Sequence, residues 1–169
     1  QFYYQIKPMT ALIPIVMYGW IPVVFYLFIR FPSQRAVIIS FIVAWLFLPQ
    51  VSIPIPILPP YTKISATCYG ILLATIIYDA GRFSSFKPGW LNLPMVIYCL
   101  CPILSQVTNG GSPITPTFNQ IITWGLPYFL GRLYLNNLDG LRQLAIGIFA
   151  GGLAYIPFTL IEGVRGPIM

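Results

Sequence analysis

A stretch of 44 residues without a charged side chain, from Pro88 to Gly131, restricts the fold of this chain more than any other feature. The segments on either side of it are nearly as apolar. The hydrocarbon core of a bilayer is about 30 Å thick, and a helix needs about 20 mostly apolar residues to cross it. The stretch is therefore long enough for two crossings, and the polar sequence from Asn109 to Pro113 is suited to turn the chain between them.

The composition extends this conclusion to the whole chain. Hydrophobic residues make up 57% of it and charged residues 7%, whereas about a quarter of an ordinary soluble domain is charged. The net charge of +6 comes from single Lys and Arg residues scattered between apolar runs, which is typical of topology anchors and not of nucleic-acid binding. We therefore expect one transmembrane domain over residues 1–169, in contact with the lipid bilayer and without a nucleic-acid partner.

Apolar runs bounded by charge or by Pro and Gly predict an all-α, polytopic helical bundle of about six spans. Several runs contain proline, which membrane helices tolerate where neighbours satisfy the freed carbonyl groups, so we expect kinked helices. Between the second and third spans, the alternating prolines of residues 52–60 forbid a regular helix and favour an extended strip. The spans are expected near residues 12–29, 36–48, 64–78, 91–107, 118–130 and 144–161.

The basic residues predict an orientation. Six of the nine fall in the connections after the first, third and fifth spans, and the positive-inside rule places that side in the cytoplasm. Both ends of the chain, the proline-rich strip and the turn at Asn109 would then face outward. The expected cytoplasmic set is Arg30, Arg35, Arg82, Lys87, Arg132 and Arg142.

Most active-site signatures are absent from the sequence. The chain has no His and three carboxylates, so a catalytic triad, a two-carboxylate acid–base pair or a His-based metal site cannot be assembled from this segment. No glycine-rich loop precedes Lys-Ser or Lys-Thr, which excludes P-loop nucleotide binding. We expect no metal and no cofactor. Asp79 and Arg82 have the spacing of a local ion pair.

A few polar side chains remain as candidates for binding. Four of them fall on the expected outer face: Lys63, Asn109, Glu162 and Arg165. The simplest interpretation of each one alone is an anchor at the membrane interface. If they converge, two cations and an amide would suit a lipid-linked diphosphate at headgroup depth. Arg132, on the inner face, is either an anchor or a group that reaches into the bundle.

Glycines in the last span have helical spacing. Gly147 and Gly151 lie four residues apart, followed by Gly152, and such a small-residue face lets another helix approach closely. Glycine enrichment without a packing role is the alternative, and the sequence favours neither.

Four short motifs follow one another between Ala36 and the end of the chain, each occurring once. They are Leu46-Phe47-Leu48-Pro49 with the proline-rich strip and Lys63, Thr108-Asn109-Gly110, the run from Leu126 to Tyr134, and a last span that closes on Glu162 and Arg165-Gly166-Pro167. This ordered set resembles the amino-terminal half of bacterial O-antigen ligase-like membrane proteins. The resemblance implies a glycosyltransferase of the bacterial inner (cytoplasmic) membrane that joins or polymerises glycans carried on undecaprenyl diphosphate.

The resemblance also implies that Lys63, Asn109, Arg132, Glu162 and Arg165 are substrate-binding positions. The family's large external loop, which bears essential basic residues, is missing from this sequence, so we expect a non-catalytic first half of a longer chain. The alternative is a non-catalytic scaffold or accessory subunit that packs on other membrane subunits or on lipid. A transporter is a third interpretation, disfavoured because no charge lies at the centre of a span.

Overall fold

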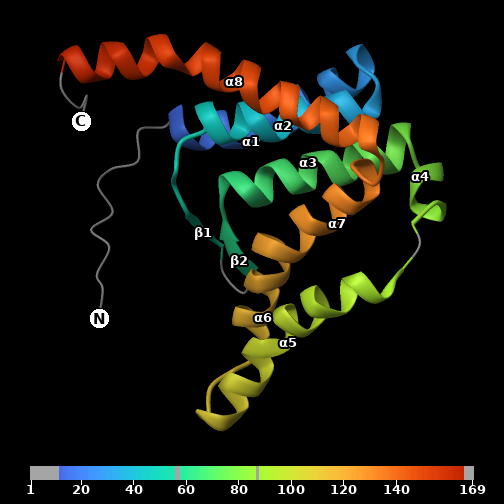
Figure 1. Ribbon diagram of the computed structural model, residues 1–169. Coiled ribbons are helices and arrows are strands. Elements are labelled where there is room, and N and C mark those ends of the chain that lie inside the picture. Colours follow the sequence, from blue (N-terminus) through green and yellow to red (C-terminus); the bar gives the residue numbers. More distant parts are fainter. Residues whose placement is uncertain (1–11, 56–57, 87, 166–169) are drawn as a thin grey trace.

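The computed structural model describes residues 12–55, 58–86 and 88–165, and most of these are helical, as predicted (Figure 1). Helices occupy all six of the apolar ranges expected from the sequence. In chain order the elements are α1 (Leu12–Arg30), α2 (Ser33–Phe47), β1 (Ile53–Ile55), β2 (Leu58–Tyr61), α3 (Lys63–Tyr78), α4 (Gly81–Ser84), a 3₁₀ turn (Trp90–Asn92), α5 (Leu93–Thr108), α6 (Ile114–Gln120), a π-helical turn (Ile121–Gly125), α7 (Leu126–Tyr134) and α8 (Leu138–Arg165).

Four helices, α1, α2, α3 and α7, contribute most of the buried core. α1 packs along α3, where the side chain of Val24 lies over Gly70, so that a Cβ atom at this glycine would be 3.3 Å from Val24. The small hydroxyl side chains in this core bond to their own helix: Ser40 donates to Ala36 O at 2.7 Å. Hydroxyl groups satisfied in this way can be buried without a partner from another helix.

Three helices in the described part of the chain are long and apolar enough to cross a membrane: Ile13–Arg30, Trp90–Thr108 and Leu138–Ile161. α2 and α3 are also apolar but shorter. The side chains of α5 and α8 are mostly exposed, for example Leu104 at 73% and Phe149 at 70%. Exposed apolar surface of this extent is typical of a face that meets lipid or another protein.

Prolines shape two of the connections between these helices. The proline-rich strip forms an antiparallel hairpin in which Ile53 pairs with Tyr61, so the extended conformation expected there is present as β1 and β2. The fifth apolar range is divided into α6, a π-helical turn and α7. The π-helical turn ends two residues before Pro127, and because this proline has no N–H to donate, the helix cannot keep regular α-helical bonding there.

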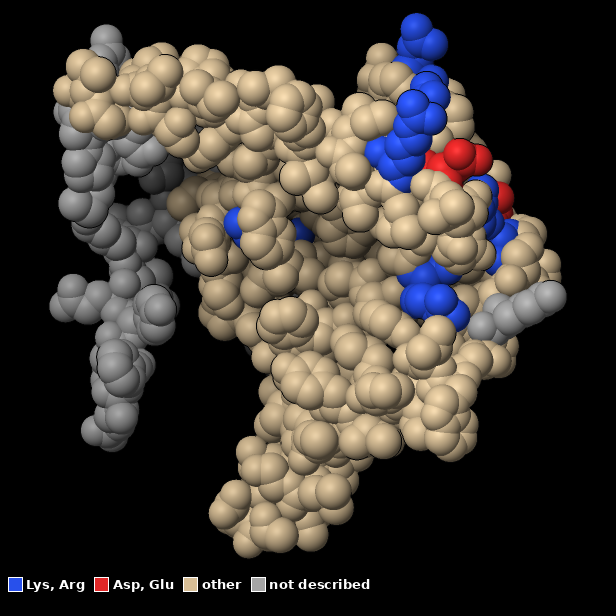
Figure 2. Space-filling model, in the orientation of Figure 1, with Lys and Arg blue, Asp and Glu red and all other residues tan. Residues whose placement is uncertain are grey.

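The connections that follow α1, α3 and α7 meet at one end of the bundle. The side-chain amide of Gln34, at the start of α2, donates to Tyr134 O at 2.7 Å and to Asn137 Oδ1 at 3.1 Å. The Arg82 guanidinium lies over the Tyr134 ring, 4.9 Å from its centroid. Most of the visible Lys and Arg side chains gather near this end, around α4 (Figure 2). We call it the basic end.

Candidate functional site

Lys63 is the first residue of α3, at the end of the bundle opposite to the basic end. Thr62 fixes the start of this helix: its hydroxyl accepts from the Ser65 N–H at 3.3 Å, while the Ser65 hydroxyl accepts from the Thr62 N–H at 2.7 Å. This reciprocal cap satisfies two N–H groups that would otherwise have no partner. It also sets the position from which the Lys63 side chain extends.

The Lys63 ammonium group lies against Trp45 of α2. It is 4.8 Å from the centroid of the indole ring and donates to Trp45 O at 3.4 Å. A cation over an aromatic face is attracted by the ring quadrupole, by about 0.5–1 kcal/mol at exposed sites. Lys63 is therefore held across the gap between α2 and α3.

Beneath Lys63 is an apolar groove of about 190 Å³ between α2, α3 and the π-helical turn. Its wall is almost entirely carbon, and Lys63 is the one charged group among the residues that line it. Those residues are Phe41, Ala44, Trp45, Lys63, Ile64, Thr67, Thr123, Trp124 and Pro127. An apolar trough with a cation at one edge can accept an amphipathic anion whose tail lies in the trough.

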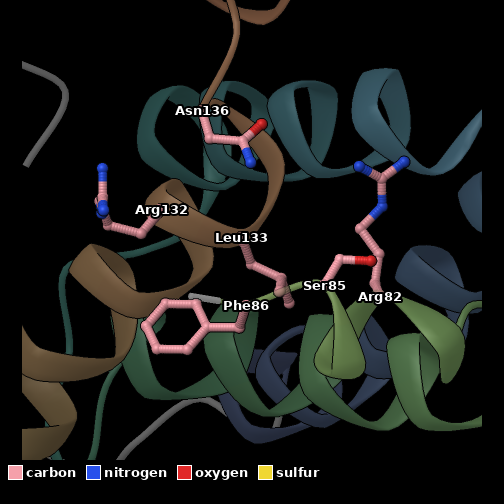
Figure 3. Close-up of a pocket in the computed structure, with 6 residues that line it drawn as sticks. All are labelled: Arg82, Ser85, Phe86, Arg132, Leu133 and Asn136. Carbon is pink, nitrogen blue, oxygen red and sulfur yellow. The ribbon is translucent and has the colours of Figure 1, made fainter. Parts of the chain in front are cut away.

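Arg132 lines a different cavity, of about 300 Å³, at the basic end (Figure 3). Its Nε atom is buried and has no hydrogen-bond partner in the part of the chain that the structure describes. Arg82 lines the same cavity, and its own Nε donates to the Asp79 carboxylate at 3.0 Å, which confirms the predicted ion pair. The complete lining is Arg82, Ser85, Phe86, Arg132, Leu133 and Asn136.

The structure does not bring the described candidates together in one site. Lys63 begins α3 and Arg82 follows its end, and a helix of 16 residues is about 24 Å long. Lys63 and Arg132 therefore belong to cavities at opposite ends of the bundle. Asn109 lies at the end of α5, where its side-chain amide donates to Ser105 O at 2.7 Å, and it lines neither cavity.

Glu162 and Arg165 belong to the last turns of α8, but their side chains lie outside the described part of the structure. The glycine face of the same helix is well defined. A Cβ atom at Gly147 would lie 2.8 Å from Ile42 Cδ1 of α2, and one at Gly151 would lie 2.7 Å from Ile42 Cγ2. Gly152 faces open space. Of the three glycines that the sequence suggested for helix packing, the first two therefore lie where α8 closely contacts α2.

The contact of Lys63 with Trp45 was not predicted from the sequence, nor was the cavity that Arg82 and Arg132 line together. The two residues of each pair are separated by a hairpin or by entire helices, so no local spacing signals either arrangement. No family model, curated protein or solved structure matches this chain.

Proposed function

We propose that this chain is the amino-terminal part of a membrane glycosyltransferase of the O-antigen ligase or polymerase type, and that the groove beneath Lys63 receives the polyprenyl-diphosphate carrier of the glycan. The observation that supports this most is the pairing of one ammonium group with an adjoining apolar groove. The carrier has the complementary chemistry, because its diphosphate is anionic and its isoprenoid chain is apolar.

The proposal includes the arrangement of the chain in the bacterial inner membrane. All six apolar ranges cross the bilayer, with α6 and α7 together forming the fifth crossing, and the basic end lies in the cytoplasm. Lys63 is then at the level of the outer headgroups, where the diphosphate of an outer-leaflet carrier would be found. Glu162 and Arg165, at the end of α8, belong to the same outer level.

Neutralising Lys63 tests the carrier site. Binding of undecaprenyl diphosphate to the full chain in detergent would be measured for the wild type and for Lys63→Gln. Arg142→Gln is the charge-matched control, because Arg142 is an exposed residue of α8 near the basic end. A hydrogen bond to a charged group contributes about 1.5–3 kcal/mol, so Lys63→Gln should weaken binding by about tenfold or more. Arg142→Gln should bind as the wild type does.

A second variant tests the apolar part of the groove. Thr123→Leu adds bulk to the wall formed by the π-helical turn, so it should weaken binding of the long-chain carrier more than binding of inorganic diphosphate, which has no tail. If Lys63→Gln and Thr123→Leu both bind the carrier as tightly as the wild type, the groove is not the carrier site.

A non-catalytic scaffold or accessory subunit is the second candidate. The feature in its favour is that most apolar side chains of α8 are exposed, for example Phe149 at 70% and Leu160 at 64%, although its glycine face and two aromatic side chains meet α2. A scaffold needs such a surface for partner helices and does not need the groove. Unchanged carrier binding in both groove variants would leave the scaffold as the better interpretation.

A further inference from the structure

We propose that the cavity between Arg82 and Arg132 binds the phosphate group of an anionic lipid headgroup. This site is separate from the groove beneath Lys63, lies at the other end of α3 and does not depend on the glycosyltransferase proposal. The ligand is a lipid of the surrounding membrane leaflet, such as phosphatidylglycerol, and not the glycan carrier.

The first support is the Arg132 side chain, which lines the cavity together with Arg82 and is only partly buried. Its Nε–H is enclosed and has no hydrogen-bond partner among the described residues, so no described acceptor neutralises this guanidinium group. The other N–H groups of the same guanidinium can donate to an anion in the cavity. A guanidinium group and a phosphate are well matched, because the planar fork of N–H groups can donate to two phosphate oxygens at once.

The second support is the charge around the cavity. Two arginines line it, and the acidic group next to them is Asp79, which is engaged by Arg82 at 3.0 Å. One positive charge, that of Arg132, therefore remains without a carboxylate partner among the described residues. Ser85 and Asn136 add neutral hydrogen-bonding groups to the lining, which suits a phosphodiester of single negative charge.

The third support distinguishes a lipid from a free anion. Phe86 and Leu133 supply apolar lining next to the polar groups, as Figure 3 shows, and the Phe86 ring packs on Phe129 with 5.0 Å between centroids. Trp90, which follows in the same connection, is 84% exposed, and tryptophan is enriched at the level of lipid headgroups. Basic pockets between membrane helices near the cytoplasmic leaflet are suited to anionic headgroups for the same electrostatic reason.

Lipid binding to the full chain in detergent tests this proposal. Native mass spectrometry would measure the affinity for phosphatidylglycerol and for phosphatidylcholine, which has the same phosphodiester but no net charge. We expect the wild type to prefer phosphatidylglycerol, Arg132→Gln to lose about tenfold in affinity for it, and Arg132→Lys to keep part of the preference. Arg142→Gln, with the same loss of charge outside the cavity, should behave as the wild type.

Two results would overturn the proposal. One is an equal loss of phosphatidylglycerol affinity in Arg132→Gln and Arg142→Gln, which would mean that binding follows net charge and not the cavity. The other is displacement of the lipid by inorganic phosphate at comparable concentration, which would make a free anion the ligand. Melting temperatures of the lipid-free variants separate loss of binding from loss of fold, and Arg132→Lys retains the cation if Arg132→Gln does not fold.

Discussion

The hydroxyl groups of Thr75 and Tyr134 lie 2.8 Å apart in the core of the bundle and join α3 to α7. Thr75 also donates to Ile71 O, one turn earlier in α3, at 2.7 Å. Its single proton is used in that bond, so Tyr134 must be the donor in the contact between the two helices. Both side chains are fully buried, so a hydroxyl group that loses its partner here cannot bond to water instead.

Thr75→Val should destabilise the protein more than Tyr134→Phe. The valine leaves the tyrosine hydroxyl buried without an acceptor, at a cost of about 1–3 kcal/mol, whereas the phenylalanine leaves Thr75 still bonded to Ile71 O and costs about 1 kcal/mol. The double variant should lose less than the sum of the two single losses. Unfolding in detergent measures all three, and strict additivity would show that the hydroxyl groups do not interact.

The glycine face of α8 should tolerate substitution unequally. Gly151→Ala places a methyl group 2.7 Å from Ile42 Cγ2, so α2 and α8 must separate, at a cost of about 1–3 kcal/mol by analogy with overpacked cores. Gly152→Ala, one residue further along, meets nothing and is the matched control. Thermal stability in detergent should fall for Gly151→Ala alone. Equal effects in the two variants would mean that helix propensity and not packing decides them.

The orientation proposed for the bundle is directly testable. Single cysteines at Ser52 and Ser112 should react with an impermeant thiol reagent in intact cells, and those at Ser84 and Asn136 should react only after the membrane is opened, because the positive-inside rule places them in the cytoplasm. All four residues are exposed, so access is not limited by packing. The background is a variant without the three native cysteines. Labelling of the Ser84 site from outside would reverse the orientation.

Stability should fall at alkaline pH, and Tyr61 should account for part of the fall. Burial, followed by the nearby Tyr18 and Tyr69, raises the pKa of this hydroxyl above its usual value of 10.0. The stability that the protonated Tyr61 hydroxyl contributes is therefore fully present below the pKa that this hydroxyl has in the unfolded chain. It is lost as the pH rises through the higher pKa of the same hydroxyl in the folded state.

Tyr61→Phe cannot ionise at this position, so its stability should decline less steeply above about pH 10 than that of the wild type. Tyr26→Phe, at a tyrosine that is 62% exposed, is the control. Unfolding in detergent as a function of pH would show the difference. Parallel alkaline profiles for the wild type and Tyr61→Phe would exclude Tyr61 as a contributor.

Features that depend on neighbouring residues were accessible from the sequence. Hydropathy gave the positions of the apolar helices within a few residues, because each run carries its own apolar surface. The prolines of residues 52–60 gave an extended segment because they restrict φ and remove N–H donors. The ion pair of Asp79 with Arg82 followed from a spacing of three residues at the end of a helix.

Contacts between residues of different helices could be seen only in the tertiary structure. Lys63 meets Trp45 because α2 and α3 pack side by side, and Arg132 shares a cavity with Arg82 because α7 packs on α3. Nothing in the apolar pattern of a membrane helix selects its neighbour, since nearly every face of it is apolar and lipid is as apolar as another helix. The sequence alone therefore determined the helices and their polar ends, while side-chain packing between distant segments determined how those ends combine into two separate cavities.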